Sequence, residues 1–339
     1  MKKSKWITTL TYAALIIFGT SFTLPFFWLI STSFKPAARI QKWPPDILPM
    51  QQVYAHQDGK SLAVYIINAP DKKAGDVLLL NKLKEGNALV KYADNPRSTP
   101  MVVSFDNLTE KAKPGLEWKN YTKGLTFIPF LQELRNTLTV SILSVIGTIL
   151  SCSLVAYGLA KIDWHGRNSL FIIMLSTMML PAQVTMIPIF AIFVKLGWVD
   201  TFLPLIIPAF LGSPFFIFLL RQFFMGIPKE LSEAARLDGC SEFDIYRRVV
   251  MPLSKPALAT VGLFTFMGAW NDFLGPLIYL VDESKYTLSL GLAMFTGQYG
   301  NEYGMLMAVS TVVTIPIIVM FFFTQKTFIQ GMTMSGIKG

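Results

Sequence analysis

Six long apolar segments constrain the fold of this 339-residue chain more than any other feature of its sequence. They run over residues 7–33, 136–160, 169–194, 202–221, 257–281 and 305–324. Each is long enough to cross a bilayer, which takes about 20 residues of helix. Hydrophobic residues make up 52% of the chain and charged residues only 15%, whereas soluble domains are about one-quarter charged. The sequence therefore predicts an all-α membrane protein with six transmembrane helices, the first of them uncleaved.

The distribution of Lys and Arg predicts the orientation of these helices. If the six helices alternate in direction, thirteen basic residues of the termini and short loops fall on one side, whereas the short loops opposite hold only Lys195 and Lys285. The thirteen are Lys2, Lys3, Lys5, Lys161, Arg167, Arg221, Lys229, Arg236, Arg247, Arg248, Lys255, Lys326 and Lys338. Positively charged short loops stay in the cytoplasm, so both termini are expected there. The net charge of +9 then reflects this asymmetry and not nucleic-acid binding.

The stretch between the first two predicted helices, residues 34–130, is expected on the outer side. Short β-prone runs occur in it at residues 61–68, 76–80 and 88–92. Gly-containing turns separate these runs, which indicates a small antiparallel β module. Prolines at 96, 100 and 114 predict an extended return to the membrane. A disordered loop is the alternative.

These features divide the chain into three parts. Residues 1–45 hold the first transmembrane helix and the start of the outer loop. Residues 46–114 form an extracytoplasmic insertion, and residues 115–339 form a five-helix core that includes a polar loop at 221–256.

Residues 228–256 are a polar island between the fourth and fifth apolar segments. Pro228 suits the first turn of a helix, Glu230 and Glu233 lie where the helix dipole favours acids, and Gly239 suits the left-handed position that ends it. One face of this helix is predicted to combine Leu231, Ala234, Ala235 and Asp238. The two alanines would let a partner approach the backbone closely.

A second short helix is predicted directly after the first. Ser241 is expected to cap it, with Asp244 three residues on in a capping-box arrangement. Its apolar stripe is predicted to be Phe243, Tyr246 and Val250, and Pro252 and Pro256 are expected to end it. Such a helix–Gly–helix segment fits an interfacial hairpin on lipid headgroups, a self-packing linker, or a docking site for a soluble partner.

A motif within the island resembles a known family. The run EAARLDG from Glu233 to Gly239, followed by Phe243 and by MPLSKP from Met251 to Pro256, is similar to the EAA motif of the inner-membrane subunits of binding-protein-dependent ABC importers. The chain departs from the family pattern by having Cys where alanine is usual, at position 240.

The resemblance covers about residues 1–45 and 115–339, but not the insertion. Further stretches look like the maltose-type carbohydrate branch of the family, and within it like the second, shorter permease subunit. These stretches are LPAQVTMIP at 180–188, WNDFLGP at 270–276 and GMTMSGIKG at 331–339.

The resemblance implies that the polar loop sits in a cleft of a cytoplasmic ATP-binding subunit. The residues implied in this coupling are Glu233, Ala234, Ala235, Asp238, Gly239 and Pro252. Glu233 is expected to meet a basic residue of that subunit, and closure of two such subunits on ATP would move the loop as a rigid body, switching access across the membrane. The tail Thr327–Gly339 is expected to reach into the ATPase pair. A second permease subunit and an extracytoplasmic solute-binding protein complete the implied complex.

No catalytic or metal-binding motif is recognisable in the sequence. Gly331 and Gly336 are followed by Ile337-Lys338 and not by the Lys-Ser/Thr of a phosphate-binding loop. The two cysteines and two histidines lack metal-ligand spacing. We therefore expect a transport subunit that is not an enzyme and binds no cofactor or metal directly, with ATP used by separate subunits.

Three polar residues within apolar segments are candidates for the transport pathway or a gate. Asn271 and Asp272 lie about 15 residues into the predicted fifth helix, and ionisable groups at that depth usually face the bundle interior or water. A helix-packing hydrogen bond is the other interpretation. Gln183, between Pro181 and Pro188, has the same two interpretations.

The resemblance thus implies half of a heterodimeric permease in the prokaryotic cytoplasmic (inner) membrane that imports a sugar or oligosaccharide. An importer of a non-sugar solute, such as a polyol phosphate, a peptide or an amino acid, remains open. So does a membrane receptor whose outer module senses a ligand. A membrane enzyme is disfavoured by the lack of a clustered nucleophile or metal-ligand set.

Overall fold

The computed structural model describes residues 5–57, 59–68, 73–84, 86–95, 98–297 and 302–336. The basic residues expected at the termini, Lys2, Lys3 and Lys338, lie outside the described residues, as does Pro96. The chain divides into two compact units, Met1–Leu125 with Gly300–Thr311, and Thr126–Tyr299 with Val312–Gly339. Each unit is described by itself.

The first unit begins with the long helix α1 (Lys5–Ser33) and a short helix α2 (Ala37–Ile40). The end of α1 is fastened to α3 (Lys119–Phe127) by polar side chains. Asn120 donates hydrogen bonds from Nδ2 to the carbonyl oxygens of Ser33 and Lys35, at 2.8 and 2.9 Å. The hydroxyls of Ser33 and Tyr121 lie 2.8 Å apart. These bonds satisfy carbonyl groups that the end of α1 leaves without a helical partner.

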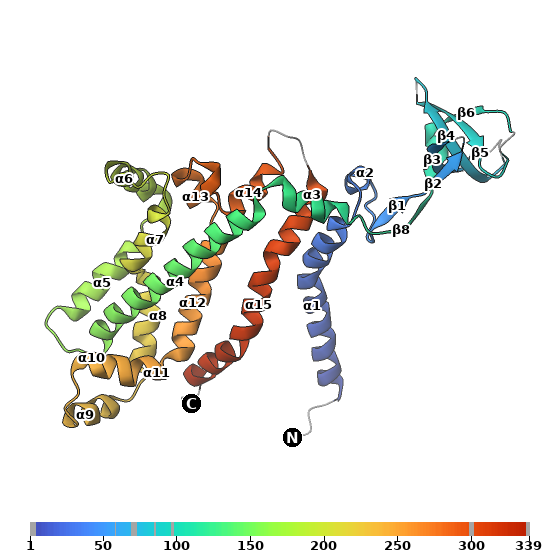
Figure 1. Cartoon of the computed structure of the whole chain (residues 1–339). Helices are drawn as coiled ribbons and strands as arrows, with labels where there is room; N and C mark the ends of the chain where they lie inside the picture. The colour runs from blue at the N-terminus through green and yellow to red at the C-terminus, as the bar shows by residue number, and fades with distance from the viewer. Residues whose placement is uncertain are drawn as a thin grey trace. The chain divides into compact units, whose positions relative to one another are not determined.

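A small antiparallel sheet follows α2 in the chain (Figure 1). Its strands pair in the order β2-β3-β4-β5-β6. Strand β7 also pairs with β3, at residues 65–67, whereas β2 pairs with residues 60–63. Strand β1 pairs separately with β8. Their bounds are β1 (Met50–Gln52), β2 (Tyr54–Gln57), β3 (Lys60–Ile67), β4 (Gly75–Lys82), β5 (Asn87–Tyr92), β6 (Met101–Ser104), β7 (Leu108–Glu110) and β8 (Ala112–Pro114).

Side chains from alternate positions of these strands build a core of their own. Ile67, Val77, Ala88 and Val90 are fully buried in it, as period-two alternation requires. Strands β3, β4 and β5 coincide with the three predicted β runs, so the alternative of a disordered loop is wrong for the described part of this segment. In the part predicted as an extended return to the membrane, β6 and β7 join the sheet.

The second unit is a helical bundle built around one long helix, α4 (Phe130–Ala160). This helix packs against α7, α8 and α12. Apart from the short helices of residues 229–253, the unit also contains α5 (Arg167–Thr177), α6 (Ala182–Lys195), α7 (Leu203–Phe210), α8 (Pro214–Met225), α12 (Lys255–Trp270), α13 (Leu274–Tyr279) and α14 (Leu288–Met294). The last helix, α15 (Tyr303–Gly336), belongs to this unit from Val312 onward.

Close approach within this bundle depends on a small residue at the α4–α7 contact. A Cβ atom added at Gly147 would lie 2.5 Å from the nearest ring carbon of Phe210, well inside van der Waals contact. Gly147 therefore sets how closely α7 can pack on α4.

Among the described residues, four helices are long and apolar enough to cross a membrane, and six spans result if two bent helix pairs each count as one. The third predicted helix is one of these pairs, because α5 and α6 meet at 96° on either side of Pro181. Proline interrupts helical hydrogen bonding and permits such a bend.

The fifth helix is predicted to span residues 257–281, and its second half is wrong. Helix α12 ends at Trp270, and non-helical residues separate it from the six-residue helix α13. Asn271 is the C-cap of α12, and its Nδ2 donates to the carbonyl of Met267 at 2.8 Å. An apolar run alone does not reveal such a local side-chain bond.

Candidate functional site

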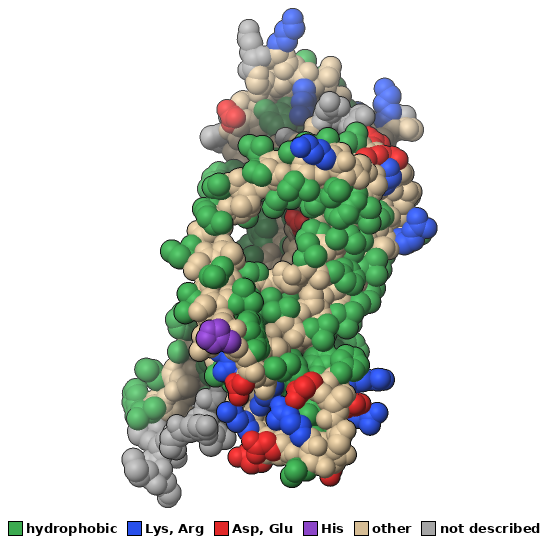
Figure 2. Space-filling view, turned by 90° about the vertical axis from the view of Figure 1, so that its left-hand side faces the viewer, with side chains coloured by type: hydrophobic (Ala, Val, Ile, Leu, Met, Phe, Trp, Pro, Cys, Tyr) green, Lys and Arg blue, Asp and Glu red, His purple; other side chains and the backbone are tan. Residues whose placement is uncertain are grey.

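The polar island folds into short helices that lie between α8 and α12 in the chain. These are α9 (Lys229–Leu237), α10 (Glu242–Ile245), a π-helical turn (Tyr246–Val250) and α11 (Met251–Leu253). Figure 2 shows charged side chains of both signs gathered at the end of the bundle that carries them, below a mainly hydrophobic flank. An apolar flank next to a charged end is the distribution expected of a membrane protein.

A left-handed glycine ends α9 as predicted. Gly239 has a φ of +82°, and its amide donates to the carbonyl of Arg236 at 3.0 Å, while the amide of Cys240 donates to that of Ala235 at 2.9 Å. This pair of bonds is the Schellman arrangement, which satisfies carbonyls at a helix end. Pro228 lies one position earlier than expected, at the N-cap of α9.

Ser241 begins the second short helix as predicted. Its hydroxyl accepts a hydrogen bond from the amide of Asp244 at 3.2 Å and donates to the Asp244 carboxylate at 2.5 Å. The cap and the Schellman turn fix the backbone on both sides of Cys240, so α9 and α10 meet at a defined corner.

The predicted shared face of α9 is wrong for one residue. Leu231, Ala234 and Asp238 are exposed, but Ala235 is buried together with Ser232. The inward face of α9 packs on the hydrophobic core that contains Ile245, and small side chains at 232 and 235 permit that close approach. The surface available to a partner therefore carries one alanine instead of two.

A chain of hydrogen bonds ties both short helices to the end of α4. Nε of Arg236 on α9 lies 2.8 Å from Oε1 of Glu242 on α10. The hydroxyl of Tyr157 on α4 donates to Oε2 of the same carboxylate at 2.7 Å. The hydrogen bond and charge of Glu242 raise the pKa of Arg236 above its ordinary value. One carboxylate thus joins three helices.

The apolar stripe of the second short helix is only partly as predicted. Tyr246 and Val250 are buried, whereas Phe243 is exposed. The Tyr246 hydroxyl lies 2.8 Å from that of Ser153 on α4. This contact is a second link between the polar island and α4. Pro252 lies near the C-terminal end of the helical segment Glu242–Leu253. The segment that begins at α10 then bends by 79° into α12.

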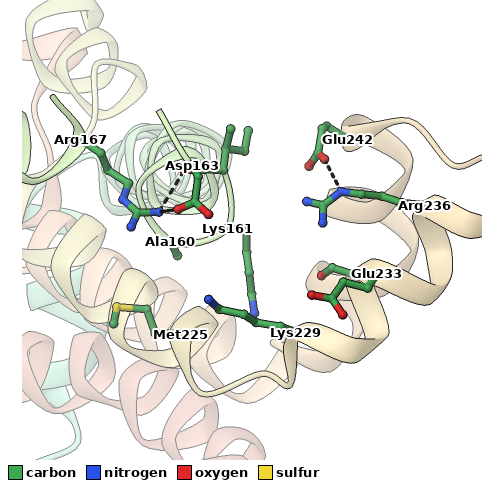
Figure 3. Close-up of a pocket in the computed structure, with 11 residues that line it drawn as sticks. Ala160, Lys161, Asp163, Arg167, Met225, Lys229, Glu233, Arg236 and Glu242 are labelled. Atoms are coloured by element: carbon green, nitrogen blue, oxygen red, sulfur yellow. Dashed lines mark hydrogen bonds and ion pairs between the residues drawn. The ribbon is translucent and has the colours of Figure 1, made fainter. Parts of the chain in front are cut away.

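A cavity of about 520 Å³ lies beside α9. Figure 3 shows Glu233 and Lys229 on its α9 side, facing Lys161 and Asp163 from the turn after α4. Lys161 donates from Nζ to the carbonyl of Ile227 at 2.7 Å. Burial and the nearby charge of Lys229 lower the pKa of Lys161, although Glu230 opposes this shift. Glu233 is exposed at the surface of α9.

The three candidate pathway residues lie at breaks between helices. Asn271 is exposed and caps α12, and Asp272 is partly buried and accepts a hydrogen bond from the amide of Gly275 at 3.1 Å. Gln183 is exposed in the first turn of α6. Asn271 and Asp272 follow α12, whereas Gln183 belongs to α6. The first two make local bonds at the helix end.

Sequence reasoning missed Tyr157, Ser153 and Glu242 as members of this site. Tyr157 and Glu242 are 85 positions apart in the chain, and Tyr157 lies within an apolar segment. No local pattern indicates that two such residues meet. Among the described residues, no group of three or more His, Cys, Asp or Glu side chains is arranged to hold a metal ion.

Comparison with known proteins decides the family. Residues 147–333, which include α9, α10 and the bonds around Glu242, match the family described as the inner membrane component of binding-protein-dependent transport systems. The chain belongs to this family. It is thus a permease, which is a transport subunit.

Relatives of this permease cover most of its length. It is 37% identical over 262 residues to the arabinooligosaccharides transport system permease protein AraQ of Bacillus subtilis (strain 168), covering 77% of this chain and 89% of that protein. It is 33% identical over 249 residues to the trehalose/maltose transport system permease protein MalG of Thermococcus litoralis, covering 70% and 89%.

A solved structure shares the fold of this permease. It belongs to a bacterial ABC transporter involved in the import of the acidic polysaccharide alginate. The TM-score is 0.67 and the identity 23%, with 97% of this chain and 99% of that chain covered.

Proposed function

We propose that this permease forms, with a second permease subunit, the membrane pathway for ATP-driven uptake of a sugar or oligosaccharide. The observation that carries the proposal is the set of relatives named as carbohydrate permeases, which align with most of this chain. Its six spans have both termini in the cytoplasm, and the β sheet lies on the outer side with the solute-binding protein. The chain then consists of the first transmembrane helix with the start of the outer loop (residues 1–45), the insertion (46–114) and the five-helix core (115–339).

The polar island is proposed as the coupling element. Helix α9 would dock on one of two ATP-binding subunits through the exposed residues Glu233, Ala234 and Asp238. Gly239 holds the corner to α10, and Ala235 holds α9 against the bundle.

The bonds around Glu242 make this element a stiff transmitter. They connect α9 and α10 with α4, while α11, with Pro252, leads into α12. A push on α9 would therefore reach two spanning helices at once, and discrete packed states of the bundle would convert it into a switch of access. The tail Thr327–Gly339 is proposed to contact the same ATP-binding subunits; its last three residues lie outside the described part of the chain.

The residues at the helix breaks are proposed as part of the pathway or its gate. Gln183 and Asn271 expose polar side chains within otherwise apolar segments, and Asp272 lies beside the break that ends α12. Polar groups at such breaks can meet a hydroxyl-rich solute, because irregular backbone at membrane depth is tolerated where it lines a cavity.

The test replaces Gly239 by Val in the reconstituted complex. A branched residue is strained at a φ of +82°, so the corner between α9 and α10 should deform. We expect binding-protein-dependent ATPase activity and oligosaccharide uptake to fall at least about tenfold while the subunit still inserts.

Gly197→Val is the matched control. Gly197 also has a positive φ, +68°, and open space at its Cβ position, but it lies between α6 and α7. Normal uptake by the Gly239 variant would disprove the coupling role. Equal loss in both variants would attribute the effect to general backbone strain. A screen across oligosaccharides with the unaltered complex tests the substrate class separately.

A further inference from the structure

The cavity beside α9 has features that the coupling role does not use, although Glu233 and the Arg236–Glu242 pair belong to both. One wall is the turn between α4 and α5, with Lys161, Asp163 and Arg167, and the opposite wall is α9 (Figure 3). Ala160, Ile162 and Met225 add apolar surface. All of these residues belong to the second unit.

Two of the four cations that line the cavity are already neutralised. Arg167 pairs with Asp163 at 2.6 Å, and the Arg236–Glu242 pair closes the far side. The other two cations are the ammonium groups of Lys161 and Lys229, and in the described part of the chain neither lies within 4.0 Å of a carboxylate oxygen. They are close enough to repel each other, since the charge of Lys229 lowers the pKa of Lys161. An anion between them would relieve this repulsion.

A buried hydroxyl also lacks a partner in this cavity. Ser232 lines it and is 4% exposed, and its Oγ has no hydrogen bond to any described residue. Buried polar groups are nearly always hydrogen-bonded, so a ligand atom is the natural partner. A hydroxyl can donate to an oxyanion, as the two lysines can.

We propose that this cavity binds the headgroup of an anionic phospholipid. Basic pockets between spanning helices on the cytoplasmic side suit such headgroups. The cavity lies where α4 ends and α5 begins, next to the exposed ring of Trp164, and Trp is enriched at membrane interfaces. The phosphate oxygens accept bonds from Lys161, Lys229 and Ser232.

Glu233 selects among anionic headgroups. Its carboxylate faces the cavity (Figure 3) and would repel a bare phosphate, but it accepts hydrogen bonds from hydroxyls. A glycerol headgroup carries such hydroxyls beside its single phosphate charge. The site therefore favours phosphatidylglycerol over inorganic phosphate.

The test measures phosphatidylglycerol binding to the full-length, delipidated permease in detergent by native mass spectrometry. Phosphatidylcholine and inorganic phosphate are the comparison ligands. We expect phosphatidylglycerol to bind tightest and each of Lys161→Gln and Lys229→Gln to weaken it about fivefold, since one basic residue near a headgroup contributes on that order. Ser232→Ala, which changes little in shape, should weaken it as well.

Arg247→Gln is the matched control, because Arg247 is exposed on the same polar island but does not line the cavity. Its binding should equal that of the unaltered protein. Equal weakening by this variant would show general surface attraction and overturn the site. So would equal binding of phosphatidylcholine, saturation by inorganic phosphate alone, or undiminished binding by the lysine variants. None of these outcomes depends on transport, so failure here leaves the proposed function intact.

Discussion

At the scale of single residues, Glu242 connects the short helices of the polar island to the long helix α4. It accepts hydrogen bonds from Arg236 on one side and Tyr157 on the other, so it serves both the short helices and the long helix α4. A hydrogen bond to a charged group contributes more than a neutral one, about 1.5–3 kcal/mol. Loss of this one group therefore removes the hydrogen bonds that join α9 and α10 to Tyr157 of α4, and leaves the contact between Tyr246 and Ser153.

Tyr157→Phe removes one arm of this tie while keeping the ring. The ring should retain its edge-on contact with Tyr246, whose centroid lies 5.4 Å away. We expect a loss of about 1–2 kcal/mol in the free energy of unfolding and weaker coupling of ATPase activity to uptake. Thermal unfolding in detergent and ATPase assays of the reconstituted complex measure the two effects.

A double-mutant cycle with Glu242→Gln checks that the two residues act through each other. Side chains in contact show interaction energies of about 0.5–3 kcal/mol. Strictly additive losses in the double variant would mean that Tyr157 and Glu242 contribute independently, contrary to the proposed tie.

At the scale of elements, the packing of α7 on α4 depends on Gly147. Gly147→Ala places a methyl group against the ring of Phe210, and overpacking of this kind costs about 1–3 kcal/mol. The unfolding midpoint should fall accordingly. Gly158→Ala is the control on the same helix, because a Cβ there meets nothing within 4 Å. Ala has the higher helix propensity of the two residues, so Gly158→Ala should be neutral or slightly stabilising. A similar loss in both variants would contradict the role assigned to the α7 contact.

The loop between α6 and α7 is fastened by Asp200 to the loop after α13. Its carboxylate accepts from the amides of Val281 and Asp282, each at 3.0 Å, and from Lys285 Nζ at 2.7 Å. These bonds lower the pKa of Asp200 to about 2, against an ordinary value of about 3.9. The carboxylate form is thus favoured by the folded state, and its stabilisation is complete above about pH 4 and lost as the pH falls towards 2.

Asp200→Asn should remove this pH dependence. Asn tolerates the left-handed backbone, with a φ of 60° at this position, so the fold should persist. The difference in unfolding midpoint between the original protein and the variant should be constant from pH 7 to 5 and shrink from about pH 4 downward. A difference that stays the same down to pH 2.5 would contradict the role assigned to the carboxylate.

How far the elements follow from the sequence depends on how local their cause is. The position of α1, the ends of α9 and the cap at Ser241 were predictable, since apolar length, a left-handed glycine and a capping serine act within a few residues. The break after Trp270 and the inward turn of Ala235 were not. Both depend on bonds and packing that only the folded bundle supplies.

At the scale of the whole molecule, the proposed orientation can be tested with the native cysteines. Cys240 is partly exposed at the corner between α9 and α10, and Cys152 is buried. A membrane-impermeant maleimide should label Cys240 in inverted vesicles but not in intact cells. Lys60→Cys in β3, made with Cys240→Ser, should give the opposite result. Labelling of both positions from the same side would refute the proposed topology.

The proposed coupling site shows the limit of prediction for the molecule as a whole. Glu233, Asp238 and Gly239 were found because a motif records them side by side. Tyr157 and Ser153 were not, because they lie in a helix whose sequence is otherwise that of a membrane span. The fold brings these two residues into contact with the polar island, and no spacing pattern in the sequence predicts that contact.

The pairing of β1 with β8 bears on how such a chain can change over evolutionary time. Met50 lies opposite Pro114 and Gln52 opposite Ala112, so the backbone departs for the sheet and comes back at the same spot. Residues 53–111 could therefore be gained, exchanged or lost in a single insertion or deletion event in the gene. After a deletion, a tight turn would connect β1 to β8. The sheet could thus change in sequence independently of the membrane helices.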